Sequence, residues 1–68
     1  MSDTVHKKIE VVGTSGESFA KAVASAVAKA SESVRNLEWF EVTELRGRIT
    51  GDKIAQYQVS LKIGFKLD

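Results

Sequence analysis

Among the 68 residues of this chain, the one best suited to bind a ligand is Trp39, the only Trp in the sequence. Its indole could serve as a flat platform for a planar ligand. It could also anchor an interface between subunits, where Trp is enriched. The two hypotheses are compatible, and both require the side chain to project from an exposed face.

The other polar candidates give weaker signals. His6 is the only His and has no second metal ligand nearby, so we expect a solvated side chain. Strand alternation sends Glu41 to the face that carries Trp39 and sends Glu38 and Glu44 to the other face, which argues against a catalytic pair of carboxylates. Near a symmetry axis, one of these carboxylates could help to bind a cation.

Two arginines and one glycine-containing turn complete the candidates. Arg46 and Arg48 could protect a strand edge against aggregation, or Arg46 could meet a phosphate group. The segment 12–17 lacks the Gly-Lys-Ser/Thr ending of a phosphate-binding loop, so a strand-to-helix turn explains it. No arrangement of Ser, His and Asp can be argued from spacing, and we expect no enzymatic activity.

Composition indicates one ordinary globular domain over residues 1–68, with 43% apolar residues, 28% charged residues and a net charge of +1. This charge argues against a main role in binding nucleic acid or an anionic membrane. The absence of Cys excludes disulfides, thiolate metal sites and Cys nucleophiles. The sequence contains no apolar run of membrane-spanning length and no signal-peptide pattern, so we expect a cytoplasmic protein.

The elements that must position Trp39 follow from hydrophobic periodicity. Alternation predicts a first strand over residues 5–12 that ends at Gly13. Thr14 as N-cap and Glu17 three residues later match a capping box, which opens a helix that runs to about Asn36. Two further strands are predicted over 37–49 and 53–67, joined by a tight turn at 50–53. The predicted fold class is α+β with the order β-α-β-β.

In the predicted sheet the third strand lies in the middle, in the order 2-3-1, because every pair of strands is then antiparallel. One helix covers one face, and the other face is open. The helix is apolar over more of its circumference than a monomer needs, although Ala is also simply a good helix former. Since a chain this short buries little surface by itself, we expect it to assemble into an oligomer.

Centring the hairpin between Gly51 and Asp52 places Trp39 opposite Gly64, which leaves the indole uncovered on the open face. The same register places Leu45 opposite Gln58 on that face, beside Leu37. It places Phe40 and Val42 in the core under the helix. In this register Trp39 and Gln58 lie roughly 20 Å apart, so a site that uses both must combine different subunits.

Several segments of the chain resemble the dodecins, a family of small flavin-binding proteins. They are Val12-Gly13-Thr14-Ser15, Asn36-Leu37-Glu38-Trp39-Phe40-Glu41-Val42, Arg46-Gly47, Tyr57-Gln58-Val59 and Gly64-Phe65. The resemblance implies a hollow homo-dodecamer with helices outside, in which pairs of flavins lie between two symmetry-related indoles. It implies that Trp39 stacks on the isoalloxazine and that Gln58 hydrogen-bonds its pyrimidine edge. Arg46 matches a position near the ribityl chain or phosphate.

The chemistry of these side chains suits that assignment. An electron-rich indole stacks well on an electron-poor isoalloxazine, and a Gln amide offers both a donor and an acceptor. Such a stack quenches flavin fluorescence, which indicates storage or photoprotective sequestration of riboflavin, FMN or FAD. Coenzyme A is a further ligand if Arg46 meets a phosphate. The alternatives are a purely structural oligomer with Trp39 as interface anchor, and a flavoenzyme that turns the flavin over.

Overall fold

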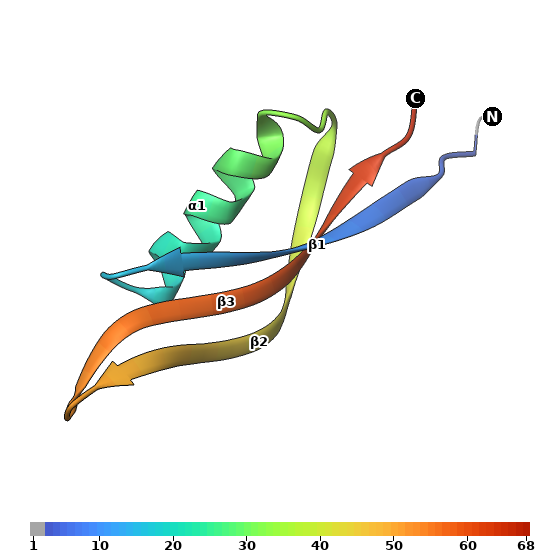
Figure 1. The fold of residues 1–68 in the computed structure, drawn as a ribbon. Helices are drawn as coiled ribbons and strands as arrows, with labels where there is room; N and C mark the ends of the chain where they lie inside the picture. The colour runs from blue at the N-terminus through green and yellow to red at the C-terminus, as the bar shows by residue number, and fades with distance from the viewer. Residues whose placement is uncertain (1–2) are drawn as a thin grey trace.

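The computed structural model describes residues 3–68, and these form a three-stranded antiparallel sheet with one helix (Figure 1). The elements are β1 (His6–Ser15), α1 (Phe19–Ser31), β2 (Leu37–Thr50) and β3 (Lys53–Lys66). The sheet order is β1-β3-β2, and both strand pairs are antiparallel. The predicted α+β class, the element order and the central third strand are therefore confirmed.

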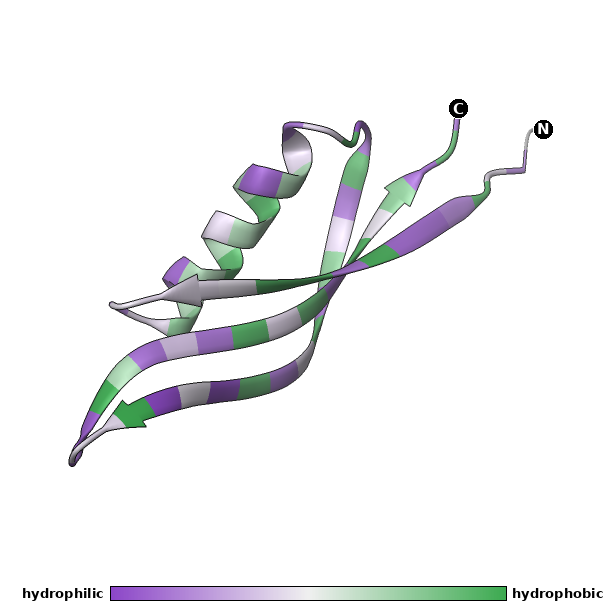
Figure 2. Cartoon of the chain, viewed as in Figure 1, coloured by the Kyte–Doolittle hydropathy of each residue, from purple (hydrophilic) through white to green (hydrophobic). Residues whose placement is uncertain are grey.

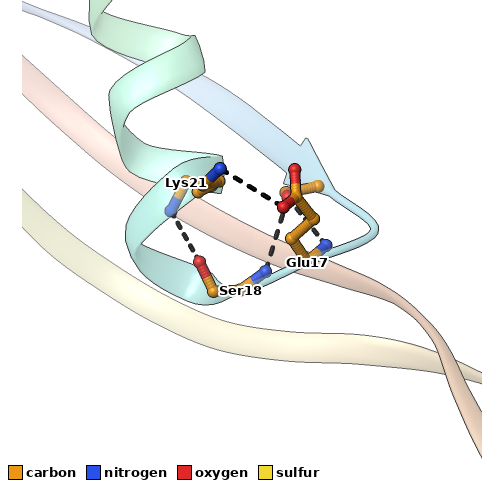
Figure 3. A network of polar contacts seen from close by, with 4 residues as sticks. Glu17, Ser18 and Lys21 are labelled. Carbon is orange, nitrogen blue, oxygen red and sulfur yellow. Dashed lines mark hydrogen bonds and ion pairs between the residues drawn. The ribbon is translucent and has the colours of Figure 1, made fainter.

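The connection from β1 to α1 differs from the predicted capping box. Thr14 still belongs to β1, where it pairs with Gln58, so it is not free to cap the helix. The N-cap is Ser18, whose hydroxyl accepts a hydrogen bond from the backbone N–H of Lys21 at 3.0 Å. Glu17 forms an ion pair with Lys21 at 3.2 Å, and both contacts are visible in Figure 3.

The helix is also shorter than predicted, since it ends at Ser31 and not near Asn36. Asn36 has a φ of 66°, in the left-handed region, which a continuing right-handed helix does not allow. Its side-chain amide donates to the Asp68 carboxylate at 2.9 Å, and its carbonyl accepts from the N–H of Lys66 at 3.1 Å. These bonds tie the start of β2 to the end of β3.

The core is small and lies where α1 covers β3 and β1. It consists of Ala22, Ala26, Val59, Leu61 and Ile63. Gly13 does not end β1 but lies inside it, directly under the helix. A Cβ there would stand 2.1 Å from the carbonyl oxygen of Ala22, so only glycine allows this close approach of helix and strand.

The helix does not cover β2, and this corrects one prediction about the core. Val42 and Phe40 pair with Leu61 and Ile63, which places them on the helix side of the sheet as predicted. They are nevertheless 44% and 51% exposed, because α1 packs on the other two strands. Figure 2 shows hydrophobic residues along β2 and β3 as far as the hairpin end that extends away from α1.

The chain is thin and extended for its length. Its principal dimensions are 57 × 20 × 13 Å and its radius of gyration is 14.3 Å. A compact domain of this length would have a radius of gyration of about 11 Å. Apolar side chains such as Leu45 and Ile49 remain more than half exposed. This shape agrees with a chain that completes its burial by contact with further copies.

Substitution of Gly13 by Ala tests the close contact between β1 and α1. We expect Gly13→Ala to lower the free energy of unfolding by about 1–3 kcal/mol, because the new methyl group collides with helix backbone. Gly16→Ala is the matched control, since a Cβ at Gly16 meets nothing within 4 Å. Urea denaturation followed by circular dichroism, at one protein concentration, measures both. Equal stability of the two variants would contradict the packing argument.

Candidate ligand-binding site

Trp39 lies on the open face of the sheet, opposite Gly64 of the central strand. A Cβ at Gly64 would be 2.3, 2.3 and 2.6 Å from three atoms of the indole. Nearly equal distances to three ring atoms mean that Gly64 lies beneath the face of the ring and not beside its edge. The predicted pairing is confirmed, but Gly64 does more than leave the ring uncovered. The indole rests on backbone, and Trp39 keeps 40% of its surface exposed.

Four charged or titratable side chains surround the indole, two from β1 and two from β2. His6 lies with its ring centroid 5.2 Å from that of Trp39, the two planes tilted by 53°. The His6 Nε2 contacts Glu38 Oε1 at 2.7 Å, and Lys8 donates to Glu41 at 3.0 Å. The indole Nε1 also donates weakly to Glu41 at 3.4 Å. Both acidic side chains thus reach across the central strand to β1.

Two of these positions differ from the sequence-based expectations. His6 is not simply solvated, because its side chain is only 28% exposed and contacts both Trp39 and Glu38. Glu38 was predicted on the helix side. The structure places it at an irregularity between Leu37 and Trp39, where it has no partner in the strand ladder and its side chain reaches the open face. Such a bulge leaves no clear signal in the sequence.

The two leucines predicted beside Trp39 lie on the other face. Leu37 pairs with Phe65 and packs against the core. Leu45 pairs with Val59, a fully buried residue on the helix side, and not with Gln58. The register shifts by one residue between Val42 and Glu44, so every later β2 residue changes face relative to the prediction until the next irregularity.

This shift brings Arg46 opposite Gln58 and creates a second polar cluster on the open face. Arg46 Nε donates to Gln58 Oε1 at 2.8 Å, and Gln58 Nε2 donates to Gln56 at 2.8 Å. Arg46 also forms an ion pair with Glu44 at 3.3 Å, so Glu44 lies on the open face and not on the predicted helix side. The structure therefore joins two predicted site residues, Arg46 and Gln58, that the sequence did not bring together.

The orientation of the Gln58 amide follows from these partners. A guanidinium only donates, so the oxygen of the amide must face Arg46 and the nitrogen must face Gln56. Each atom makes one of its two hydrogen bonds within the chain, which leaves one donor and one acceptor for a ligand. Trp39 is opposite Gly64, six residues from Gln58 along β3 and thus about 20 Å away. One chain therefore holds two separate parts of a site.

Within residues 3–68, Glu38, Glu41 and Glu44 each pair with a different basic side chain, and no carboxylate pair forms. The same part of the chain contains no group of three or more His, Asp or Glu residues placed to hold a metal ion. None of its helices is long and apolar enough to cross a membrane.

A family model described as Dodecin matches residues 5–68. The chain belongs to the dodecin family. It is 47% identical over 64 residues to "Dodecin" of Thermus thermophilus, a match that covers 94% of this chain and 93% of the relative. It superposes on dodecin from Streptomyces coelicolor with a TM-score of 0.95 at 47% identity, over 100% of this chain and 97% of that one.

A more distant dodecin carries a different name. "Calcium dodecin" of Mycobacterium tuberculosis is 31% identical over 64 residues, which cover 94% of this chain and 90% of the relative. Its crystal structure superposes with a TM-score of 0.81 over 94% of this chain and 91% of that one. The family match agrees with the predicted resemblance, and the structures agree with the β-α-β-β fold.

Substitution of Gly64 by Ala tests the contact between the indole of Trp39 and the backbone of Gly64. We expect Gly64→Ala to displace the Trp39 ring, because the new Cβ would occupy the space beneath it. The ring can move outward without unfolding the sheet, so the near-ultraviolet circular dichroism and emission of Trp39 change while far-ultraviolet circular dichroism does not. Gly16→Ala is again the control. Unchanged Trp39 spectra in Gly64→Ala would show that the ring does not rest there.

The Lys8–Glu41 pair makes a prediction about pH. The hydrogen bond from Lys8 holds the pKa of Glu41 below its usual value of 4.5. The stabilisation from this pair is therefore present above about pH 4.5 and is lost as the pH falls through the lowered pKa. We expect Lys8→Met to raise the pKa of Glu41, measured by NMR of the side-chain carboxyl carbon. Lys7→Met, on the opposite face, should leave it unchanged.

Proposed function

We propose that this chain binds a flavin non-covalently in a homo-dodecameric shell and serves storage or photoprotective sequestration, without catalysis. The observation that carries the proposal is the indole of Trp39, which lies flat on the backbone of Gly64 with its outer surface exposed on the open face of the sheet. A fixed, exposed aromatic plane is suited to stacking on another plane. Membership of the dodecin family supports the same ligand class.

In this proposal Trp39 supplies the stacking surface and Gln58 supplies polar recognition. The pyrimidine edge of an isoalloxazine presents acceptors and a donor, and the Gln58 amide retains one free group of each kind. Arg46 orients that amide through its Nε, which leaves other guanidinium N–H groups to reach a ribityl hydroxyl or a phosphate. FMN, FAD and coenzyme A are then possible ligands in addition to riboflavin.

The distance between the two parts of the site supports assembly. Trp39 and Gln58 lie about 20 Å apart along the sheet, which exceeds the length of an isoalloxazine, so one chain cannot use both on one ring. Two copies related by symmetry can combine the Trp39 of one with the Gln58 of the other. The exposed apolar side chains of β2 supply surface for such contacts.

A riboflavin titration tests the proposal, with flavin and Trp39 emission recorded together. We expect joint quenching at about one flavin per chain, and a loss of affinity of roughly 5- to 150-fold in Trp39→Ala, equivalent to about 1–3 kcal/mol for one stacking contact. Trp39→Phe, which retains an aromatic face, should lose less. Gln58→Ala should weaken binding about 2- to 12-fold for a lost hydrogen bond, with stacking and quenching retained.

Light scattering on the same samples tests the shell and provides the control. We expect a particle of twelve chains of 7.4 kDa in the wild type and in the variants. Riboflavin that stays bright in an intact particle would disprove flavin binding and favour the structural role of Trp39. Dissociation of Trp39→Ala into smaller species would show that the indole also holds subunits together.

A further inference from the structure

The His6–Glu38 pair lies beside the indole that supplies the proposed stacking surface, although neither residue is part of the site proposed above. His6 comes from β1 and Glu38 from β2, and they meet at 2.7 Å on the open face beside Trp39. The imidazole ring is 5.2 Å from the indole, centroid to centroid. An ionisable ring so close to an aromatic platform can change the electronic character of that platform.

The contact with Glu38 determines where the proton of a neutral His6 resides. A carboxylate only accepts hydrogen bonds, so Nε2 must carry a hydrogen and donate it to Oε1. The other ring nitrogen, Nδ1, is then free to take a proton. Protonation therefore converts the ring to a cation without breaking its bond to Glu38, and the ring stays beside Trp39 in both charge states.

The other charged side chains on this face determine the electrostatic environment of His6. Lys66 of β3 pairs with His6 in the strand ladder. Lys8 and Glu41 pair with each other on the same face, and Glu41 also accepts from the indole Nε1. Lys62 of β3 pairs with Glu41 in the ladder, and α1 packs on the opposite face of the sheet. Histidine is the residue type of this set whose side chain commonly exchanges a proton near neutral pH, whereas lysine and glutamate side chains do not.

We infer that His6 is a positioning residue of the flavin site and that its protonation weakens stacking on Trp39. This inference rests on the proposed flavin-binding function. The positive charge of an imidazolium close to the indole lowers the energy of the indole π electrons, which weakens the indole as a donor to an electron-poor isoalloxazine. The neutral ring instead packs against the indole and leaves its donor character intact. Flavin affinity therefore rises as the pH rises through the range in which His6 loses its proton.

Riboflavin is the probe, because the phosphate of FMN would itself titrate near pH 6 and add its own pH dependence to the measured dissociation constant. We expect the dissociation constant of the wild type to be about two- to fivefold higher at about pH 5.5 than at about pH 8. His6→Gln can donate to Glu38 but does not ionise, so its affinity should be independent of pH in this interval. Lys7→Gln, a neighbour on the other face of β1, should behave as the wild type does.

A second measurement needs no ligand, because Trp39 is the only Trp. Protonated imidazole quenches indole emission, so Trp39 emission of the free protein should fall on acidification and should not do so in His6→Gln. If His6 had a purely structural role, His6→Gln would leave the pH dependence of Trp39 emission unchanged.

The outcomes separate the inference from the function on which it rests. Riboflavin that fails to bind at any pH would overturn the proposed function, and this inference with it. Riboflavin that binds with the same affinity across the interval, or with the same profile in His6→Gln as in the wild type, would overturn the inference alone. Light scattering at each pH restricts the comparison to intact particles.

Discussion

One helix has to cover a sheet that is too long and too wide for it. The 13 residues of α1 extend about 20 Å, whereas the 14 residues of β2 or β3 extend about 46 Å. The helix therefore buries the middle of β3 and part of β1, and leaves β2 without cover. The small core, the 57 Å length and the exposed apolar side chains of β2 all follow from this mismatch.

The same mismatch explains why the candidate site lies on the open face of the sheet and not in an interior pocket. A sheet open on one face can display a large aromatic ring only where the neighbouring strand leaves room. Gly64 provides that room at the centre of the sheet, and the indole of Trp39 occupies it. Polar partners from β1 and β2 then surround the ring, so that an exposed aromatic side chain has a defined position without being buried.

Irregularities in β2 decide which side chains share the open face. The shift between Val42 and Glu44 directs Arg46 toward Gln58 and removes Leu45 to the helix side. The irregularity between Leu37 and Trp39 directs Glu38 toward His6. Each inserts a residue without a partner, and a period-two pattern changes face at that point. The positions of these two bulges therefore determine which side chains meet in the candidate site.

Sequence patterns were enough to predict the element order, the central third strand, the pairing of Trp39 with Gly64 and the family. Alternating apolar residues, a helical period and a Gly-Asp turn are local patterns, so they predict these features without knowledge of the tertiary contacts. Other features are visible only in the folded chain. They are the N-cap at Ser18, the exposure of Phe40 and Val42, the Arg46–Gln58 contact and the His6–Glu38–Trp39 cluster. These depend on bulges and on the reach of one helix, which are set by how distant strands fit together and not by any local pattern.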